Sequence, residues 1–427
     1  MKYQAPRGTL DTLPDESWKW QSIERIARTT AGLFHFAEIR TPMFEATELF
    51  HRGVGEGSDI VRKETFTFDD RGGRSITLRP EGTAGVVRAV IEAGLLNQDG
   101  ARVKVFYIAP NFRYERPEKG RLRQHHQFGA EAFGVAAPAQ DVECILLQLD
   151  FYRRCGLKDL ALQINSLGDK DSKARYRQAL VEYLTPRQAE LGADSQRRLV
   201  ENPLRILDSK DPADQAAVKD APPAAESLSD KSRKHFDAVQ QLLTDAKVAY
   251  TVNPRLVRGF DYYTDTLWEV TAAGLGSQNA VGGGGRYDGL VEDLGGRSTP
   301  GVGFGSGLER LLIALEQQGV AIPDSREPLV YLISVGDAAR SANWKLAAEL
   351  RAANIAVDLD LAGRPTRSQF TLADRDKASV ALVLGDNELA NNTVAMKDLA
   401  TGEQTIVPRG ELIVVLRTRL TRRQQAS

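Results

Sequence analysis

With 427 residues, 42% of them hydrophobic and 26% charged, the chain is long enough for two or three globular domains with buried cores. Its longest apolar runs are far too short to cross a bilayer and no apolar signal segment opens it, so we expect no membrane partner. Because the net charge is only −1, bulk charge gives no support for nucleic-acid binding. Any RNA contact must come from local basic surfaces.

The cysteines are few: Cys144 and Cys155 form no Cys-x-x-Cys pair. This usage argues against a disulfide framework or a structural zinc site, so we expect a cytoplasmic location and no protein-bound metal. The neighbouring His125 and His126 have no cysteine or acidic partner at metal-ligand spacing, which favours surface or packing roles for them.

The first part of the chain predicts helices between short, turn-rich strands. Residues 16–36 carry apolar side chains at steps of three to four, which predicts a helix with one apolar face. Residues 39–45 predict a strand whose proline suits an edge or a chain crossing, because proline lacks the backbone N–H. The other elements expected here are a hairpin of 65–69 and 75–79, a helix at 84–93, and strands at 103–108 and 127–133.

The composition changes after residue 167. Residues 169–245 are rich in charge, alanine and predicted helix, with breaks at prolines, and we interpret about 169–248 as an inserted helical subdomain. Strand-like, glycine-rich sequence resumes at 251 and leads into a helix at 308–318.

A linker at 321–328 separates a remainder in which strands and helices alternate, which predicts an α/β domain with a largely parallel sheet. We therefore expect domains at 1–325 and 326–427. The basic tail with Arg417, Arg419, Arg422 and Arg423 is a candidate RNA contact, although taken alone it more simply indicates a solvated helix end. The expected strands are 329–335, 355–361 and 380–384, and the expected helices are 338–354 and 369–377.

Two segments carry chemistry. Residues 111–128 concentrate arginines in one loop between two strands, and arginine suits bidentate capture of phosphate groups. The glycine run at 301–307 invites a dinucleotide-binding interpretation and hence a nucleotide-dependent oxidoreductase. Its spacing does not match G-x-G-x-x-G, and glycines there more simply let backbone pack closely against a ligand or a helix.

Three segments in order resemble the signature motifs of class II aminoacyl-tRNA synthetases. Ile-Arg-Thr-Pro at 39–42 is similar to motif 1, whose proline lies near a dimer interface. Residues 112–123 resemble motif 2, the hairpin that holds ATP and the acceptor end of tRNA. Gly-Val-Gly-Phe-Gly-Ser-Gly-Leu-Glu-Arg at 301–310 resembles motif 3.

Further segments narrow the resemblance to the histidyl-tRNA synthetases. Residues 256–263 and 284–290 resemble the two histidine signatures of that family, and Leu-Arg-Pro-Glu-Gly-Thr at 78–83 is typical of it. The resemblance implies an α+β fold: an antiparallel catalytic sheet with helices, a helical insertion, and a C-terminal α/β anticodon-binding domain. It also implies a homodimer whose substrates are histidine, ATP and histidine tRNA.

The resemblance implies that histidine is activated with ATP and then transferred to the tRNA 3′ end. Mg²⁺ is expected on the outer phosphates of ATP. Arg113 and Arg258 are expected to be catalytic at the α-phosphate, because cations stabilise charge that builds on phosphorus. The expected ATP-binding residues are Arg113, Glu115, Arg121 and Arg310, and the expected tRNA acceptor loop contains Arg116, Glu118 and Arg123. The expected histidine-binding residues are Glu81, Thr83, Gln127, Glu131, Arg258, Tyr262, Tyr263 and Tyr287.

The chain departs from the family pattern at two positions. His125 stands where the family has phenylalanine, and Glu118 stands where it commonly has glutamine in the loop that touches tRNA. The main alternative is a regulatory, non-aminoacylating paralogue belonging to ATP phosphoribosyltransferase. Such paralogues lack the anticodon-binding domain and parts of the histidine signatures, whereas this chain retains Arg258, Tyr263 and about a hundred residues after the linker.

Overall fold

The computed structural model describes residues 3–55, 59–118, 120–273, 275, 279–324, 326 and 328–426, without the side chains of 59 and 422–426. The chain divides into two compact units, Met1–Ile322 and Pro323–Ser427, and this division falls inside the segment 321–328. Each unit has its own hydrophobic core. Within the described residues, no helix combines the length and apolarity that crossing a bilayer requires.

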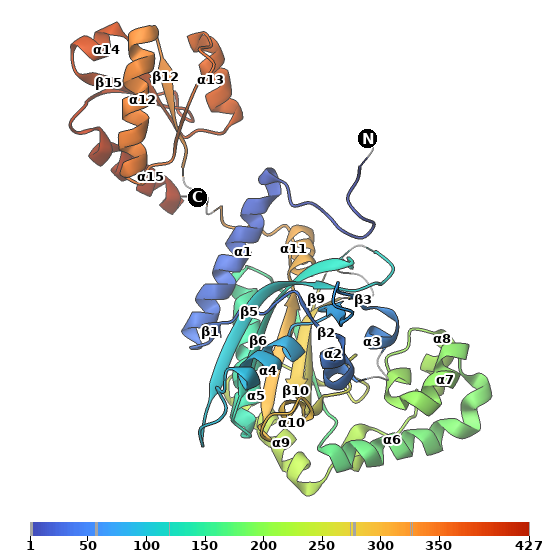
Figure 1. Ribbon diagram of the computed structural model, residues 1–427. Helices are drawn as coiled ribbons and strands as arrows, with labels where there is room; N and C mark the ends of the chain where they lie inside the picture. Colours follow the sequence, from blue (N-terminus) through green and yellow to red (C-terminus); the bar gives the residue numbers. More distant parts are fainter. Residues whose placement is uncertain are drawn as a thin grey trace. The chain divides into compact units, whose positions relative to one another are not determined.

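An eight-stranded sheet forms the centre of the first unit. All neighbouring pairs from β5 to β7 are antiparallel, and the parallel pairs β1–β5 and β7–β8 lie at the two edges. The predicted antiparallel sheet is therefore confirmed (Figure 1). In sheet order the strands are β1 (Ala37–Glu38), β5 (Val103–Phe112), β6 (Gln124–Phe133), β11 (Gly301–Gly307), β10 (Ala280–Arg286), β9 (Thr264–Ala272), β7 (Leu160–Ser166) and β8 (Thr251–Val252).

Helices cover one face of this sheet and leave most of the other face for a site. The long helices α1 (Pro14–Leu33), α5 (Pro138–Arg154), α9 (Asp230–Asp245) and α11 (Leu308–Gln317) share one core with Phe128 and other even-numbered residues of β6. Because side chains alternate along a strand, the odd-numbered residues of β5 and β6 point to the opposite face. There Val105 and Tyr107 pack near α4 (Thr83–Glu92).

The predicted strand at 39–45 is wrong, because the chain changes sheets there. Strand β1 ends at Glu38, and β2 opens a three-stranded sheet of order β2-β4-β3. The buried Arg79 fixes the crossing, since its Nη1 donates to the carbonyl oxygens of Thr41 at 3.1 Å and Pro42 at 3.2 Å. The hairpin of β3 and β4 is confirmed. The bounds are β2 (Phe44–Ala46), β3 (Phe66–Asp69), β4 (Ser75–Leu78), α2 (Thr47–Val54), α3 (Asp59–Lys63) and α10 (Leu290–Asp293).

The two central strands are longer than the sequence predicts. Strands β5 and β6 pair from Val103 with Phe133 to Phe112 with Gln124, so the polar loop is confined to residues 113–123. Cross-strand hydrogen bonds therefore keep in the strands several polar residues that local composition assigns to a loop. Helix α5 and strand β7 were not predicted at all, although both belong to the same core.

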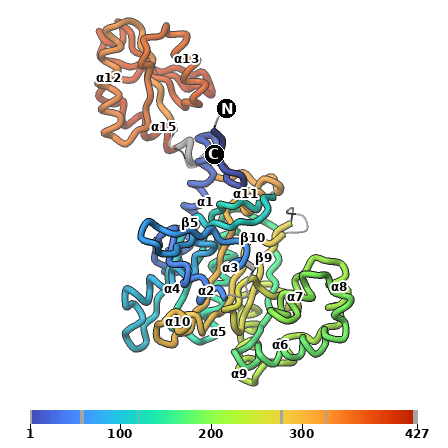
Figure 2. Tube along the Cα trace, turned by 45° about the vertical axis from the view of Figure 1, so that its right-hand side comes forward, coloured from blue at the N-terminus to red at the C-terminus, as the bar shows by residue number. Residues whose placement is uncertain are grey.

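Residues 170–245 form the helical insertion (Figure 2). Asp169 ties the start of α6 to the start of α9: it caps α6 by accepting from the Ser172 N–H at 2.9 Å and also accepts from the hydroxyl of Ser229, the N-cap residue of α9, at 2.7 Å. Apolar side chains of the insertion join the core on the α4 side of the sheet. Before α9 its elements are α6 (Lys170–Leu184), η1 (Thr185–Glu190), α7 (Ala193–Glu201), η2 (Pro203–Ile206), α8 (Pro212–Ala217) and η3 (Ala224–Ser227).

The second unit has a five-stranded sheet of order β13-β12-β14-β15-β16. The prediction of a largely parallel sheet is right for β13, β12 and β14 and wrong for the antiparallel β15 and β16. In the basic tail, Arg417 donates to the Ala353 carbonyl at 2.9 Å, and Arg419 pairs with Asp398 at 3.0 Å. The bounds are β12 (Val330–Ser334), α12 (Asp337–Ala352), β13 (Val357–Leu359), α13 (Thr366–Arg375), β14 (Val380–Leu384), α14 (Asp386–Ala390), β15 (Thr393–Asp398), β16 (Gln404–Pro408) and α15 (Leu412–Ala426).

A buried carboxylate joins the insertion to the sheet. Asp141 on α5 is fully buried and pairs with Arg286 at the end of β10. It also accepts from the Thr266 hydroxyl at 2.7 Å and lies 2.6 Å from Nε2 of His235 on α9. One side chain therefore holds two strands and the last helix of the insertion.

Replacing Asp141 by alanine is expected to lower the free energy of unfolding of the first unit by about 3–5 kcal/mol, because a buried arginine loses its main counter-charge. Urea unfolding measures the change. The control is Asp99→Ala in the same unit, which removes an exposed ion pair with Arg297 and should cost less than about 1 kcal/mol. Equal effects of the two substitutions would contradict the role given to Asp141.

Candidate active site

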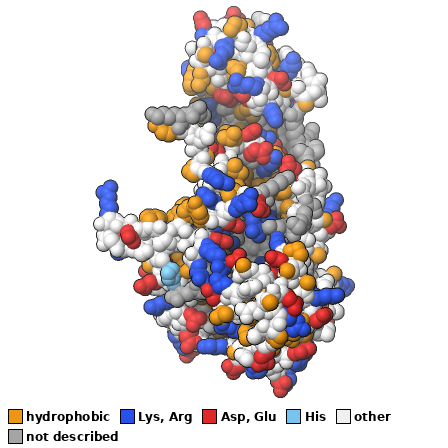
Figure 3. All heavy atoms as spheres, turned by 90° about the vertical axis from the view of Figure 1, so that its right-hand side faces the viewer, with side chains coloured by type: hydrophobic (Ala, Val, Ile, Leu, Met, Phe, Trp, Pro, Cys, Tyr) orange, Lys and Arg blue, Asp and Glu red, His pale blue; other side chains and the backbone are white. Residues whose placement is uncertain are grey.

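A cavity of about 740 Å³ opens on the sheet face to which the odd-numbered residues of β5 and β6 point. On the face drawn in Figure 3, Lys and Arg side chains gather around a hollow of the first unit. Seven of the cations that line the cavity are Arg113, Arg121, Arg198, Arg205, Lys210, Arg258 and Arg310. The cavity wall is therefore a local basic surface, although the net charge of the chain is close to zero.

The glycine run at 301–307 forms β11, an antiparallel strand, and not the turn of a dinucleotide fold. Its glycines alternate along the strand, so the face of the strand that they share carries no side chain. A Cβ added at Gly303 would collide with the Glu131 carboxylate, and one at Gly305 would lie 3.2 Å from Oε1 of Gln127. The glycines therefore leave room for polar side chains from β6, and the oxidoreductase interpretation fails.

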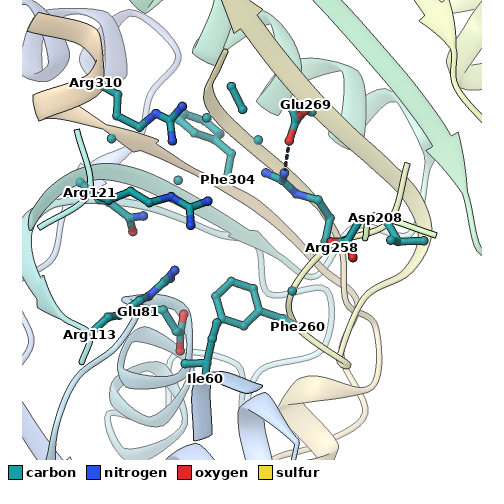
Figure 4. Close-up of a pocket in the computed structure, with 18 of the residues that line it drawn as sticks. Ile60, Glu81, Arg113, Arg121, Asp208, Arg258, Phe260, Glu269, Phe304 and Arg310 are labelled. Carbon is teal, nitrogen blue, oxygen red and sulfur yellow. Dashed lines mark hydrogen bonds and ion pairs between the residues drawn. The ribbon is translucent and has the colours of Figure 1, made fainter. Parts of the chain in front are cut away.

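Glycine has a similar purpose in β10. A Cβ at Gly283 would collide with the guanidinium of Arg258. That guanidinium lies across β10 and pairs with Glu269 of β9, at 2.6 Å between Nη1 and Oε2 (Figure 4). The bare strand thus lets one arginine reach into the cavity while a carboxylate fixes its direction.

Buried acceptors lie at the deep end of the cavity. Glu131 is fully buried, accepts from the Thr83 hydroxyl at 2.7 Å, and receives the hydroxyl of Tyr287. Burial raises the pKa of Glu131 to about 8. The Glu81 carboxylate accepts the backbone N–H groups of Thr83 at 2.5 Å and Ala84 at 2.9 Å, and burial raises its pKa as well. Of these two groups, Glu81 lines the cavity and can therefore accept hydrogen bonds from a cationic or polar ligand.

Of the predicted histidine-binding residues, six line the cavity and two lie behind its wall. Glu131 and Tyr287 belong to the second group, and their mutual hydrogen bond is next to Thr83. The ring of Tyr262 lies 4.7 Å from that of Tyr263 and 5.6 Å from that of Tyr287, between centroids. The six that line the cavity are Glu81, Thr83, Gln127, Arg258, Tyr262 and Tyr263.

The sequence interpretation missed Tyr107, which also lines the cavity and is almost fully buried. Its ring occupies the space that a Cβ at Gly82 or Gly129 would need. Burial raises the pKa of Tyr107 well above its usual value, so its hydroxyl stays protonated and can donate. The signal in the sequence was weak, because an aromatic residue in a strand usually indicates core.

All four predicted ATP-binding residues line the cavity, and Arg113, Arg121 and Arg310 face Arg258 across it (Figure 4). Nε of Arg113 donates to the Pro80 carbonyl at 2.9 Å, which fixes the direction of its guanidinium. Burial and the nearby Arg121 lower the pKa of Arg310, as expected where cations gather before an anion binds. The fourth residue, Glu115, lies 3.5 Å from Arg121.

The three residues predicted for the acceptor loop do not line the cavity. Arg116 and Glu118 are exposed on the loop between β5 and β6. Arg123 stacks on Tyr114, with 3.9 Å from its guanidinium carbon to the ring centroid, and its N–H donates to the Gly8 carbonyl at 2.8 Å. These residues therefore lie outside the cavity wall.

The insertion also contributes to the wall, which the sequence analysis did not foresee. Its segment of α7, η2 and the residues after it carries Arg198, Arg205, Asp208 and Lys210 to the cavity. The segment is fixed in part by Asn202, whose Nδ2 donates to Asp261 at 2.7 Å, close to the loop that carries Arg258.

The described residues include no group of three or more His, Cys, Asp or Glu side chains that could hold a metal ion. The positive charge of the cavity wall comes mainly from arginine side chains. Cations at one end and buried acceptors at the other suit a ligand that is anionic at one end and carries a donor at the other. Together with the antiparallel sheet and the motif 2 hairpin, this arrangement is that of the class II aminoacyl-tRNA synthetases.

Comparison with known proteins agrees with this architecture. The family model described as histidyl-tRNA synthetase matches residues 8–311, and the anticodon binding domain model matches residues 329–419. The histidine–tRNA ligase of Thermosynechococcus vestitus is 51% identical over 413 residues, which cover 97% of this chain and 96% of the relative. That of Geobacillus thermodenitrificans is 47% identical over 426 residues, which cover 99% and 100%.

Among solved structures, the apo histidyl-tRNA synthetase of S. aureus matches with a TM-score of 0.82 and 38% identity, covering 97% of this chain and 99% of that one. The chain belongs to the histidyl-tRNA synthetase family. A regulatory paralogue is not favoured, because the relatives that match nearly the whole chain at about half identity are ligases and the anticodon-binding domain is present.

The raised pKa of Glu131 makes a testable contribution to stability. Between its ordinary value of 4.5 and about 8, the folded state keeps a proton that the unfolded state has lost. The contribution of this group to the free energy of unfolding is therefore lost as pH rises through that window, by up to about 1.4 kcal/mol per unit.

Glu131→Gln cannot ionise and should remove this pH dependence. The free energy of unfolding of the variant minus that of the unaltered chain should grow by about 2 kcal/mol between about pH 5.5 and about pH 7.5. Urea unfolding at both pH values measures the difference. A difference that does not change with pH would show that Glu131 is ionised in the folded protein.

Proposed function

We propose that this aminoacyl-tRNA ligase activates histidine with ATP in the cavity on β6, β10 and β11 and then transfers it to the 3′ end of histidine tRNA. The single observation that carries the proposal is the opposition of Arg258 to Arg113, Arg121 and Arg310 around one cavity whose far end holds buried acceptors. A carboxylate and a triphosphate can meet between these cations.

In the first step, a carboxylate oxygen of histidine attacks the α-phosphorus of ATP, and pyrophosphate leaves with the electron pair of the broken P–O bond. Negative charge builds on the phosphoryl oxygens, so fixed cations lower the barrier. Arg113 and Arg258 are proposed at the α-phosphate. Arg310 is proposed at the γ-phosphate end, with Arg121 and Glu115 helping to hold the nucleotide.

Histidine recognition is proposed at the deep end. Glu81, Thr83 and Gln127 offer acceptors to the α-ammonium or the imidazole, and Tyr262 and Tyr263 enclose the ring. A buried site built of hydrogen-bonding groups rejects analogues that leave those groups unpaired, by ~10⁴ or more. Glu131 and Tyr287 act from behind the wall by holding Thr83 in place.

In the second step, a hydroxyl of the terminal tRNA ribose attacks the histidyl carbonyl and AMP leaves. The exposed Arg116 and Glu118, with Arg123, are proposed to meet the acceptor end, and residues 326–427 to bind the anticodon. ATP is proposed to enter with Mg²⁺ on its outer phosphates. A homodimer and a cytoplasmic location complete the proposal, supported by the family to which the chain belongs.

ATP–pyrophosphate exchange with each of the twenty amino acids offered separately tests the proposal. Exchange should occur with histidine alone, because only histidine satisfies the buried acceptors at both of its polar ends. Aminoacylation of histidine tRNA should follow. Exchange with none of the amino acids would refute the proposal and favour the regulatory paralogue.

Arg258→Ala is expected to lower the rate of histidine-dependent exchange by about 10²–10³-fold, because it removes a cation aimed at the developing charge. The fold should persist, since the remaining partner, Glu269, is partly exposed and can be solvated. Arg297→Ala is the matched control, since it removes an exposed arginine that pairs with Asp99 far along the chain. Near-normal exchange by Arg258→Ala would refute the assignment.

A further inference from the structure

Four side chains with polar groups lie together inside the apolar core on the helix-covered face of the sheet, and the proposed function does not use them. They are Gln148 and Tyr152 of α5, Trp268 of β9 and Ser306 of β11, and all four are fully buried. Apolar residues of the first core surround them. Because polar groups are costly to bury, four of them in such a core indicate a requirement beyond packing.

Hydrogen bonds join the four side chains to one another. Nε1 of Trp268 donates to Oε1 of Gln148 at 2.7 Å, and the Tyr152 hydroxyl donates to Oγ of Ser306 at 2.8 Å. Nε2 of Gln148 donates to Ser306 at 3.0 Å and to the Tyr152 hydroxyl at 3.3 Å. An indole N–H can only donate, so it fixes the direction of the Gln148 amide. One amide of α5 therefore links β9 to β11, which are not neighbours in the sheet.

Strand β10 lies between these two strands and is bare at this level. A Cβ added at Gly282 would collide with the Tyr152 hydroxyl and with Nε2 of Gln148. The pairing of β10 with β9 shifts register just before Gly282 and again after Gly285. Register is weakly specified in a glycine-rich strand, because side chains on a buried face normally fix it. The link across β10 therefore supplies a constraint that β10 itself lacks.

The opposite face of the same strands carries Arg258. Gly283 of β10 pairs with Glu269 of β9, and the guanidinium of Arg258 lies on Gly283 and pairs with Glu269 (Figure 4). Glu269 follows Trp268, so it points to the cavity face while Trp268 points to the core. Burial raises the pKa of Tyr152, and the charge of Arg258 acts in the opposite direction, which agrees with their lying close together across one strand.

We infer that Gln148 is a positioning residue for Arg258. Its hydrogen bonds hold β9 to β11 behind the glycines of β10, and so fix the strand surface on which the Arg258 guanidinium lies. The inference rests on the proposed function, in which Arg258 acts at the α-phosphate. If that surface shifts, Arg258 keeps its charge and loses its alignment with the phosphorus. A misplacement of about 1 Å can cost about 100-fold in rate.

Gln148→Leu has a similar volume and removes every hydrogen bond of the amide. The kcat of histidine-dependent pyrophosphate exchange should fall by about 10–100-fold, because alignment matters most in the transition state. The KM values for histidine and ATP should stay within about 2-fold of those of the unaltered chain. Tyr152→Phe removes one hydroxyl and should lower kcat by about 3–10-fold. Urea unfolding gives the folded fraction of each variant, to which kcat is referred.

Combination with Arg258→Ala separates positioning from a purely structural role. In that background neither substitution should lower the rate by more than about 2-fold, because the group that is positioned is gone. A general loosening of the site would lower the rate by the same factor in both backgrounds. Tyr176→Phe, which removes the hydroxyl of another buried tyrosine of the same unit, is the matched control and should keep the kcat of the unaltered chain.

A kcat that is unchanged in folded Gln148→Leu would overturn the inference, as would an equal fall in the presence and absence of Arg258. If Gln148→Leu does not fold, the comparison of Tyr152→Phe in the two backgrounds decides in the same way. Absence of any exchange by the unaltered chain would instead overturn the proposed function, and the inference with it.

Discussion

The site depends on two neighbouring strands that carry almost no side chains where they cross the cavity. Glu131 occupies the space where Gly303 would carry a Cβ, and Arg258 occupies the corresponding space at Gly283. A buried carboxyl group and an arginine can therefore lie flat on the sheet, directly against backbone. Glycine in a strand normally weakens it by about 0.5–1 kcal/mol, so several glycines in β10 and β11 are a cost in stability that the site imposes.

The two ends of the cavity have opposite electrostatic character for different reasons. At the deep end, Glu81 and Glu131 are removed from water, and hydrogen bonds from Thr83 and Tyr287 only partly offset the loss of hydration. At the outer end, burial and the nearby positive charge of Arg121 lower the pKa of Arg310. A ligand that carries an ammonium at one end and phosphates at the other would match both ends of the cavity in charge.

The insertion is part of the catalytic unit and not an appendage. His235 on its last helix contacts Asp141, and Asp141 holds Arg286, the residue next to Tyr287. Side chains of α7, η2 and the residues that follow η2 also line the cavity. The insertion is therefore connected both to the wall of the cavity and to the residues behind its deep end, and its position bears on the geometry of both.

The sequence by itself determined the elements whose signals are local. The hairpin of β3 and β4, the strand Val380–Leu384 and the arginines of motif 2 follow from turn residues, apolar runs and composition over a few residues. It could not give the full length of β5 and β6 or the antiparallel pair β15–β16, because these depend on hydrogen bonds to distant strands. Tertiary structure alone decided that Tyr107 and Arg205 belong to the cavity wall and that Glu131 lies behind it. Which side chains meet in a cavity depends on packing between segments that are far apart in the chain, and a local sequence pattern does not contain that information.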